Sequence, residues 1–344
     1  MSPGAVFTSL SHLNMQDFPP FLRPQAKHAA KPLLIILLAL ASTLPCHAAP
    51  GADLIREKAR VLCAFLLGNT EYSGAALDVA EPEKISQTPG QPWPTGLGPI
   101  WYVPVRIEAL GRGHFMFETG PEKELHEFAL DLPSPLAPRE GAQIGRVPNL
   151  QQFPVTGKQH PQTASGCVPT AAACLVGYWA AGEIPQWGGP ASSQPADILK
   201  KTTLRLRSKM QMQEIADTSG YTDDGSALSG AFPDELANAL RKDAEEHGAA
   251  VRVELAKFDS KKLREEIQSA RPTLVSCVVR LPHKPHLSWG HEVVAVGWQR
   301  IENLGYVGVR DNFLPTQNDS TIRWIREEVF DSMITVSQSP SKPQ

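Results

Sequence analysis

The sequence lacks a strong charge of either sign. Its 344 residues carry 33 Lys and Arg against 36 Asp and Glu, which gives a net charge of −3. A protein that binds nucleic-acid phosphates is expected to be basic, so nucleic acid is not an expected partner. Apolar residues still make up 42% of the chain and charged residues 20%. This composition supports a folded core and argues against wholesale disorder.

The sequence also lacks an apolar run long enough to span a membrane. The run at Leu33–Leu44 has about a dozen residues, whereas a bilayer of ~30 Å needs about 20. Basic residues at positions 23–31 precede it, and the small-residue stretch Cys46–Ala49 follows. This pattern is typical of a secretory signal peptide. We therefore expect residues 1–48 to be cleaved near Ala48 and the mature protein to be secreted or periplasmic.

Cysteine is scarce. Cleavage removes Cys46 and leaves Cys63, Cys167, Cys174 and Cys277, too few for a disulfide framework in so long a chain. Cys167 and Cys174 would be about 10 Å apart along a helix, too far for a bond between them. A bridge between Cys63 and Cys277 stays open as an alternative. At least one thiol is therefore expected to be free, and a free thiol in an oxidising compartment needs a reason.

Proline and glycine, in contrast, are plentiful and divide the mature chain. Helical periodicity is present at 52–68, and alternation around a Gly-Arg-Gly turn predicts a small antiparallel β unit at 101–131. A Pro-rich linker follows. We therefore expect an N-terminal region of unknown role at residues 49–145 and a second unit at residues 146–337, followed by a disordered tail at residues 338–344.

The second unit is predicted to contain mainly helices in its first half and strands in its second half. This order is typical of the α+β class. The predicted helices cover about 170–181, 196–216, 232–247 and 260–270, and the predicted strands cover 249–256, 273–281, 291–298 and 306–311.

Three residues of this unit form a candidate catalytic set. Cys167 stands at the start of a helix whose first turn contains Pro169, and the positive end of the helix dipole favours a thiolate there. His291 is predicted to open a strand, and Asp311 ends the next strand. A hairpin between the two strands would bring the carboxylate beside the imidazole and fix its orientation. This is the pattern of a nucleophile, a base and an orienting group.

The segments around these residues resemble papain-like cysteine peptidases, in particular the branch named for bacteriocin leader peptidases. Gly166–Ala173 (GCVPTAAA) is similar to the nucleophile helix of that family. The stretch 263–275 is similar to the helix and strand before its histidine, Gly290–Gly297 (GHEVVAVG) to its histidine strand, and Gly305–Asn312 (GYVGVRDN) to the strand that orients the histidine. The resemblance covers residues 146–335. It implies a papain-like fold and a Cys167-His291-Asp311 triad that hydrolyses peptide bonds without a metal or cofactor.

The resemblance also implies a glutamine that stabilises the oxyanion. The segment Pro148–Gln152 is similar to the family's glutamine segment and indicates Gln152, although fifteen positions separate it from Cys167. Gln162, five positions before the cysteine, is the alternative. Val168 stands where the family commonly has glycine. A side-chain amide and the backbone N–H of Cys167 would together donate to the developing oxyanion.

Other interpretations of these residues stay open. Asn312 is next to Asp311 and could orient an imidazole equally well. Cys277 and the histidines His283, His286 and His291 are suitable zinc ligands, but their spacing matches no compact ligand pair. We therefore expect an exported cysteine peptidase that acts on a peptide or protein. The alternative is a non-catalytic domain of the same fold that binds peptides or cell-wall fragments.

Overall fold

The structure of the protein is a computed structural model. It describes residues 51–85, 100–108, 110–134, 136–188, 195–215, 227–281, 284–312 and 321–339, without the side chains of residues 85, 195, 215 and 278–289. The predicted signal peptide, residues 1–48, lies outside the described residues, and so do residues 340–344 of the predicted tail.

One large antiparallel sheet dominates the described part of the chain. It joins twelve strands, ten of them in the order β1-β3-β4-β5-β15-β14-β13-β12-β16-β11, while β2 pairs with β3 and β6 with β13. The strands are β1 (Leu77–Val79), β2 (Glu83–Ile85), β3 (Ile100–Ile107), β4 (Gly111–Glu118), β5 (Leu125–Leu130), β6 (Gly141–Gln143), β11 (Val251–Lys257), β12 (Thr273–Leu281), β13 (Lys284–Ile301), β14 (Leu304–Arg310), β15 (Arg323–Arg326) and β16 (Phe330–Gln338). Two small sheets pair β7 (Pro154–Val155) with β8 (Thr163–Ala164), and β9 (Gln213–Ile215) with β10 (Leu228–Gly230).

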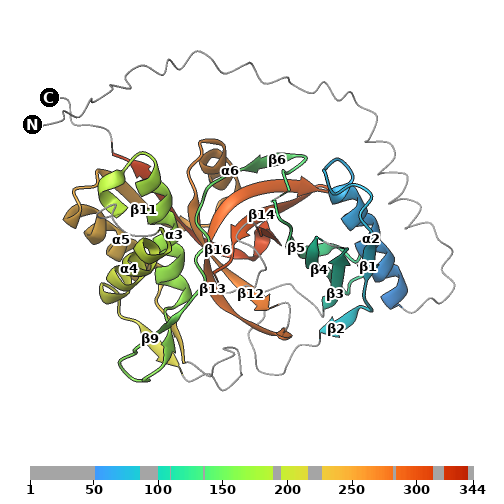
Figure 1. Ribbon diagram of the computed structural model, residues 1–344, viewed down its shortest axis with the longest axis horizontal. Coiled ribbons are helices and arrows are strands. Elements are labelled where there is room, and N and C mark those ends of the chain that lie inside the picture. Colours follow the sequence, from blue (N-terminus) through green and yellow to red (C-terminus); the bar gives the residue numbers. More distant parts are fainter. Residues whose placement is uncertain are drawn as a thin grey trace, which may run out of the picture. The chain divides into compact units, whose positions relative to one another are not determined.

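The described helices lie at several places along this sheet. The described helices are α2 (Gly51–Leu67), α3 (Cys167–Ala181), α4 (Pro195–Ser208), α5 (Pro233–Glu246) and α6 (Ser260–Gln268), with short 3-10 turns η1 (Pro185–Gly188) and η2 (Glu327–Val329). Figure 1 shows α3, α4 and α5 grouped together, and α3 also contacts β12 and β13, while α2 packs against β1 and β3. The predicted α+β class is confirmed.

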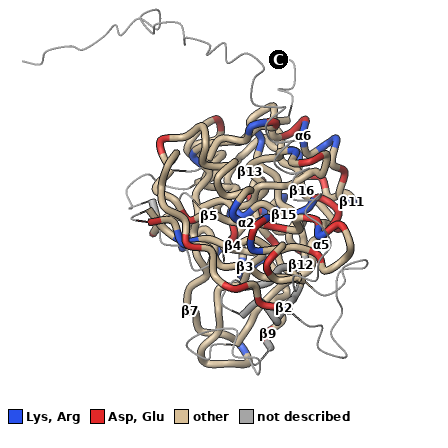
Figure 2. Tube along the Cα trace, turned by 90° about the vertical axis from the view of Figure 1, so that its right-hand side faces the viewer, with Lys and Arg blue, Asp and Glu red and all other residues tan. Residues whose placement is uncertain are grey.

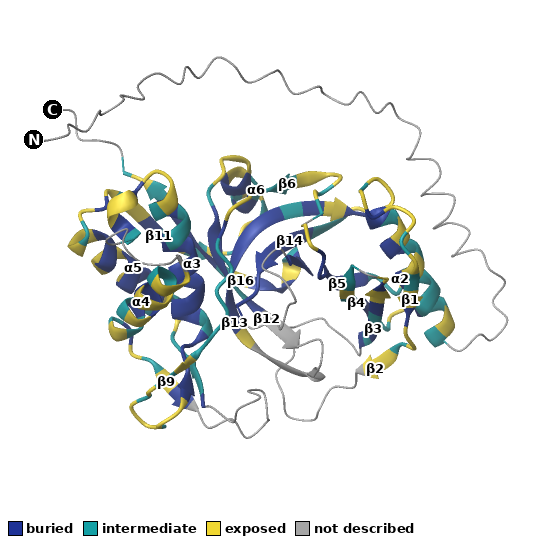
Figure 3. Ribbon diagram, in the orientation of Figure 1, coloured by how far each residue is buried: buried dark blue, intermediate teal, exposed yellow. Residues whose placement is uncertain are grey.

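The parts that carry the candidate site are the most deeply buried. Helix α3 has apolar residues on all sides, which is typical of a helix enclosed by the protein. On β13, every residue from His291 to Gly297 is buried, so both faces of this strand are covered. Figure 3 shows this dark-blue centre of β13 and α3, whereas α4 and α5 are exposed on their outer sides. Side chains in such surroundings have little freedom to move.

Two element boundaries differ from those predicted. Helix α4 ends at Ser208 instead of continuing to residue 216. The chain leaves the helix so that the Glu214 side chain can bind another loop. The Glu214 carboxylate accepts the backbone N–H groups of residues 158–160 and pairs with Arg207 at 3.0 Å. Strand β13 begins at Lys284, so the prediction that His291 opens a strand was wrong: His291 lies within the strand and is paired with Cys277 of β12.

The regions on either side of residue 145 share the large sheet. Strand β5 of the N-terminal region pairs with β15, which the sequence did not predict as a strand. The predicted linker also contains β6, which pairs with β13. At the other end of the chain, Gln338 belongs to β16, and the backbone N–H of Ser339 donates to the carbonyl of Ala250.

Charges of both signs are distributed over the described chain. Figure 2 shows Lys and Arg positions interspersed with Asp and Glu positions along the trace, for example around α5, α6 and β11. Among the helices that the structure describes, none combines the length and the apolar character needed to cross a membrane.

Candidate functional site

Cys167 is the first residue of α3, and the chain reaches it through a constrained glycine. Gly166 has φ = 94°, a backbone conformation that residues with a Cβ rarely adopt. A Cβ at Gly166 would also lie 2.9 Å from the Met212 side chain and from the Ser229 carbonyl oxygen. The Thr170 hydroxyl donates to the Gly166 carbonyl at 2.6 Å and so fixes the first turn. The sulfur therefore stands at the positive end of a rigid helix.

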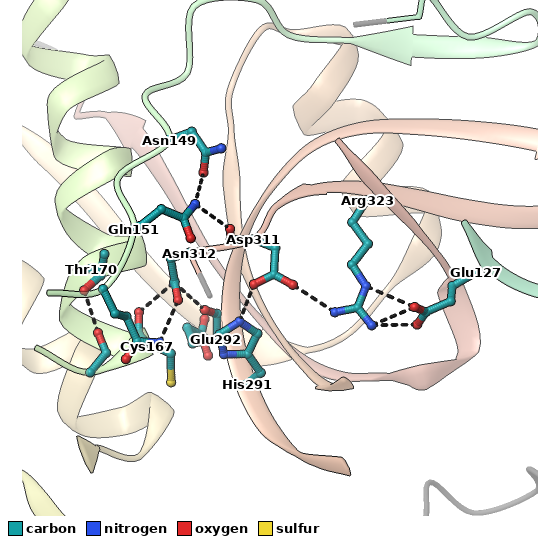
Figure 4. A network of polar contacts seen from close by, with 12 residues as sticks. Glu127, Asn149, Gln151, Cys167, Thr170, His291, Glu292, Asp311, Asn312 and Arg323 are labelled. Atoms are coloured by element: carbon teal, nitrogen blue, oxygen red, sulfur yellow. Dashed lines mark hydrogen bonds and ion pairs between the residues drawn. The ribbon is translucent and has the colours of Figure 1, made fainter. Parts of the chain in front are cut away.

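His291 lies between Asp311 and Cys167. Its Nε2–H group donates to Oδ1 of Asp311 at 2.7 Å, and both side chains are buried. The Cys167 side chain lies near enough to the ring to help raise the pKa of His291. Because Nε2 is engaged by Asp311, Nδ1 is the ring nitrogen left for the sulfur. Figure 4 shows the three residues converging from α3, β13 and the end of β14.

The charges of this group favour a protonated imidazole. Burial alone would lower the pKa of His291, but the Asp311 carboxylate and the Cys167 side chain outweigh burial and raise it to about 10. Burial likewise disfavours the charged form of Asp311, yet His291 and Arg323 hold the pKa of Asp311 well below its usual range. The site therefore contains an imidazolium and a carboxylate at neutral pH.

Asp311, and not Asn312, contacts the imidazole. Its second oxygen, Oδ2, accepts from Nη1 of Arg323 at 2.8 Å, and its backbone carbonyl accepts from the Gln151 side chain at 3.1 Å. The carboxylate thus has a different partner for each oxygen. The sequence left the choice between residues 311 and 312 open, and the geometry favours Asp311 as the orienting residue.

Asn312 instead connects the strands to the nucleophile helix. Its Nδ2 donates to the backbone carbonyls of Cys167 at 3.0 Å and Glu292 at 3.1 Å. Its Oδ1 accepts from Nε2 of Gln152 at 3.0 Å. Gln152 therefore lies one side chain away from the Cys167 backbone. Gln162, in contrast, is exposed, and its carbonyl accepts from the backbone N–H of Ala227.

Cys167 differs from the other cysteines in its exposure. It is partly exposed, whereas Cys63, Cys174 and Cys277 are buried, and all four are free thiols, so the possible bridge between Cys63 and Cys277 is not formed. Burial raises the pKa of Cys63 and of Cys174 to about 12 and that of Cys277 well above its ordinary value. These three thiols stay protonated at neutral pH and are expected to be unreactive.

A row of buried charges continues beyond Asp311, and sequence reasoning missed it. Arg323 on β15 binds Asp311 and also Glu127 on β5, with Nη2 lying 2.7 and 2.8 Å from the two oxygens of Glu127. Glu127 in turn accepts from Nε2 of His114 on β4 at 3.1 Å. A basic residue on a strand buried on both sides signals a buried acidic partner. The sequence cannot show which acid it is, because β5 and β15 are far apart along the chain.

The zinc interpretation receives no support from the described residues. No group of three or more His, Cys, Asp or Glu side chains in the described ranges is placed to hold a metal ion. His291 is bonded to Asp311, and the side chains of His283 and His286 lie outside the described residues. Glu292, the neighbour of His291, accepts from the Ser276 hydroxyl at 2.6 Å, and burial raises the pKa of Glu292 to about 7.

The structure thus brings together Cys167, His291 and Asp311, with Gln152 joined to them through Asn312. The arrangement contains the parts of a thiol nucleophile with a base and an orienting carboxylate. The chain was also compared with known proteins. Neither a scan against models of protein families nor a search of curated proteins finds a match.

Proposed function

We propose that this protein is an exported cysteine peptidase that hydrolyses peptide bonds with Cys167 as nucleophile, His291 as general acid and base, and Asp311 as orienting residue. One observation carries the proposal: His291 lies next to Cys167 at the tip of α3, and its Nε2 is bound to the buried carboxylate of Asp311 at 2.7 Å. A histidine used only for packing would not need a buried carboxylate and a thiol beside it.

The first half of the reaction forms an acyl-enzyme. The positive charge of His291 and the N-terminus of α3 favour the thiolate of Cys167. The thiolate attacks the carbonyl carbon, and the electrons of the C=O bond move to the oxygen. When this intermediate collapses, the C–N bond breaks, and the leaving amine takes its proton from Nδ1 of His291.

The second half releases the acid. Neutral His291 removes a proton from water, and the resulting hydroxide attacks the thioester carbonyl. Collapse of this second intermediate returns the electron pair to sulfur and restores the pair of thiolate and imidazolium. The net reaction consumes one water and yields an acid and an amine. Throughout, Asp311 keeps the imidazole ring in one orientation.

The oxyanion is assigned two donors in this proposal. Cys167 begins α3, so its backbone N–H has no partner within the helix. The Gln152 amide nitrogen has two hydrogens; one is directed to Asn312, which leaves the other for the substrate oxygen. Gln162 is exposed, which makes it the weaker candidate. Each such donor is typically worth about 10²–10³ in rate.

The proposal includes a papain-like fold for residues 146–337. A helix that starts at the nucleophile and packs on an antiparallel sheet that carries the histidine supports this assignment. The resemblance of the segments around Cys167, His291 and Asp311 to papain-like peptidases supports it as well. Export rests on the predicted signal peptide at residues 1–48.

Hydrolysis of a peptide library by the mature protein tests the proposal. The purified chain from residue 49 is incubated with mixed peptides, and new ends are identified by mass spectrometry. We expect cleavage that is lost in Cys167→Ala and kept in Cys63→Ala, because Cys63 is a buried thiol on α2, outside the triad. Peptides bound but not cleaved, with equal affinity in Cys167→Ala, would instead support the non-catalytic binding domain.

A further inference from the structure

The N-terminal β unit contributes ionisable side chains to a buried row that ends at the triad. His114 on β4 and Glu127 on β5 lie before residue 145, whereas Arg323 and Asp311 lie after it. All four side chains are buried, and Arg323 and Glu127 are 0% and 1% exposed. Figure 4 shows Arg323 between the two carboxylates of Glu127 and Asp311. Buried charges of this kind are expensive to maintain unless each is paired.

Glu127 fixes the direction of the Arg323 guanidinium. Nη2 of Arg323 lies 2.7 and 2.8 Å from the two oxygens of Glu127, and Nε lies 3.2 Å from Oε1. The guanidinium is planar, so these contacts determine where its remaining terminal nitrogen points. That nitrogen, Nη1, donates to Oδ2 of Asp311 at 2.8 Å.

Glu127 also balances the charge of Arg323. If Asp311 were its sole carboxylate partner, the Arg323 guanidinium would attract Asp311 with its full positive charge. It would then compete with His291 for that carboxylate. Glu127 takes up part of that attraction, since Arg323 is shared between two carboxylates. Asp311 can then keep Oδ1 on His291 at 2.7 Å while Oδ2 stays on Arg323.

We propose that Glu127 is a positioning residue of the triad, acting through Arg323 to hold Asp311 in place and to preserve the negative charge that His291 senses. The inference rests on the proposed function and deepens it. It also gives a role to the N-terminal region: strands β4 and β5 are a working part of the site, and not a propeptide that could be removed to activate it.

The titratable groups around this row come from every strand packed against it. Glu127 is near His114 on β4, His126 on its own strand, Tyr102 on β3 and Arg323 on β15. At the other end, His291 is flanked by Asp311, by Cys167 on α3 and by Glu292. Cys277 on β12 also lies near Arg323, Asp311, Glu292 and Glu127. Of these groups, only Glu127 is replaced in the variant Glu127→Gln.

Titration of His291 in Glu127→Gln tests the inference. The glutamine side chain is nearly isosteric with glutamate but neutral, so His291 would lose the support of a negative charge. We expect the NMR titration midpoint of His291 to move down by about one pH unit. We also expect kcat to fall roughly tenfold with little change in KM. A folded Glu127→Gln with the wild-type midpoint and the wild-type kcat would overturn the inference.

Two further variants keep the test decisive if Glu127→Gln does not fold. Glu127→Asp retains the charge and should keep the wild-type midpoint. The double variant E127Q/R323M removes both charges of the pair, and exchange of a buried ion pair for neutral residues is often tolerated. In this variant the two charge effects on His291 oppose each other, but Asp311 loses the Arg323 contact that holds it, so kcat should still fall roughly tenfold. A folded double variant with the wild-type kcat would overturn the inference.

A matched control is the buried pair of Asp243 and Arg205 in the helical part. Asp243 is fully buried and lies 2.8 Å from Arg205. Asp243→Asn should lower Tm without moving the His291 midpoint, which separates general loss of stability from an effect on the triad. The NMR midpoint does not depend on activity, so it still tests the coupling if the wild-type protein cleaves no peptide and the proposed function fails.

Discussion

At the scale of the residue, the candidate site depends on how differently its ionisable groups are surrounded. Three described cysteines lie within the hydrophobic core, and burial keeps them protonated. Cys167 is partly exposed and stands beside an imidazole whose pKa is raised to about 10. Burial therefore makes three of these thiols inert, whereas the fourth is the one that we propose as the nucleophile.

The first prediction concerns the pH dependence of activity. The imidazolium of His291 donates the proton to the leaving amine, so kcat/KM should fall as pH rises through about 10, where His291 loses its proton. In Asp311→Asn the carboxylate that raises this pKa is absent, and the alkaline limb should move to lower pH. We also expect kcat/KM to fall by roughly 10²–10⁴-fold. A pH–rate profile of both proteins checks this, and an unchanged alkaline limb in Asp311→Asn would contradict it.

The second prediction separates the two glutamines. Gln152→Ala should lower kcat by about 10²–10³-fold, the usual effect of losing one oxyanion donor. Gln162→Ala should keep kcat, because Gln162 is exposed, whereas Gln152 is bonded to Asn312. Single-turnover kinetics on one cleaved peptide provide the comparison. The reverse pattern would transfer the role to Gln162.

Local sequence patterns led to the three triad residues because each stands at a recognisable place: a helix start, a strand and a strand end. The same local patterns could not identify Arg323 or Glu127 as part of the site. These two residues meet only because β5 pairs with β15, across 196 positions of the chain. Pairing between such distant strands depends on the whole fold, and short-range periodicity contains no information about it.

At the scale of the element, the start of α3 decides where the sulfur lies. Gly166 enters the helix at φ = 94° with Met212 and Ser229 against it. A side chain at this position must either strain the backbone or displace these neighbours. The helix tip is therefore a second determinant of the site, besides the residues that carry the chemistry.

The third prediction follows from this geometry. Gly166→Ala should lower the free energy of unfolding by roughly 1–3 kcal/mol and reduce the reaction of Cys167 with electrophiles. Gly230→Ala is the control, because a Cβ there meets nothing within 4 Å and its φ is not positive. Urea denaturation and alkylation rates measure the two effects. Equal behaviour of the two variants would show that the conformation of Gly166 does not matter.

Elements defined by their own periodicity were predictable, and elements defined by distant partners were not. Helices α2 and α5 lie within a residue or two of the predicted ranges, since their apolar stripes and end signals are local. Helix α4 ends early because the Glu214 carboxylate binds three backbone N–H groups in another loop. Strands β15 and β16 were missed, although β15 pairs with β14 and β16 pairs with β12 in the same sheet.

At the scale of the whole molecule, the described chain is organised around one sheet to which both regions contribute. The path from β1 to β5 continues directly into β15, β14 and β13. Removal of the N-terminal region would expose the edge of β15 and leave Arg323 without Glu127. An open edge promotes aggregation, and a broken buried ion pair typically costs about 3–5 kcal/mol.

The fourth prediction is that a chain beginning at residue 146 does not yield a soluble, active protein. The chain beginning at residue 49 serves as its control, since it keeps every described strand. Solubility, circular dichroism and peptide cleavage measure the difference. A soluble and active chain from residue 146 would mean that strands β1 to β5 are dispensable for the site.

The central claim, that Cys167 is a reactive thiol activated by His291, is tested most directly by competitive alkylation. The mature protein is treated with limiting iodoacetamide at pH 6, and the modified cysteines are identified by peptide mapping. We predict that Cys167 is alkylated well before Cys63, Cys174 and Cys277, and that this preference is lost in His291→Ala. Alkylation of Cys167 no faster than that of the three buried thiols would contradict the account.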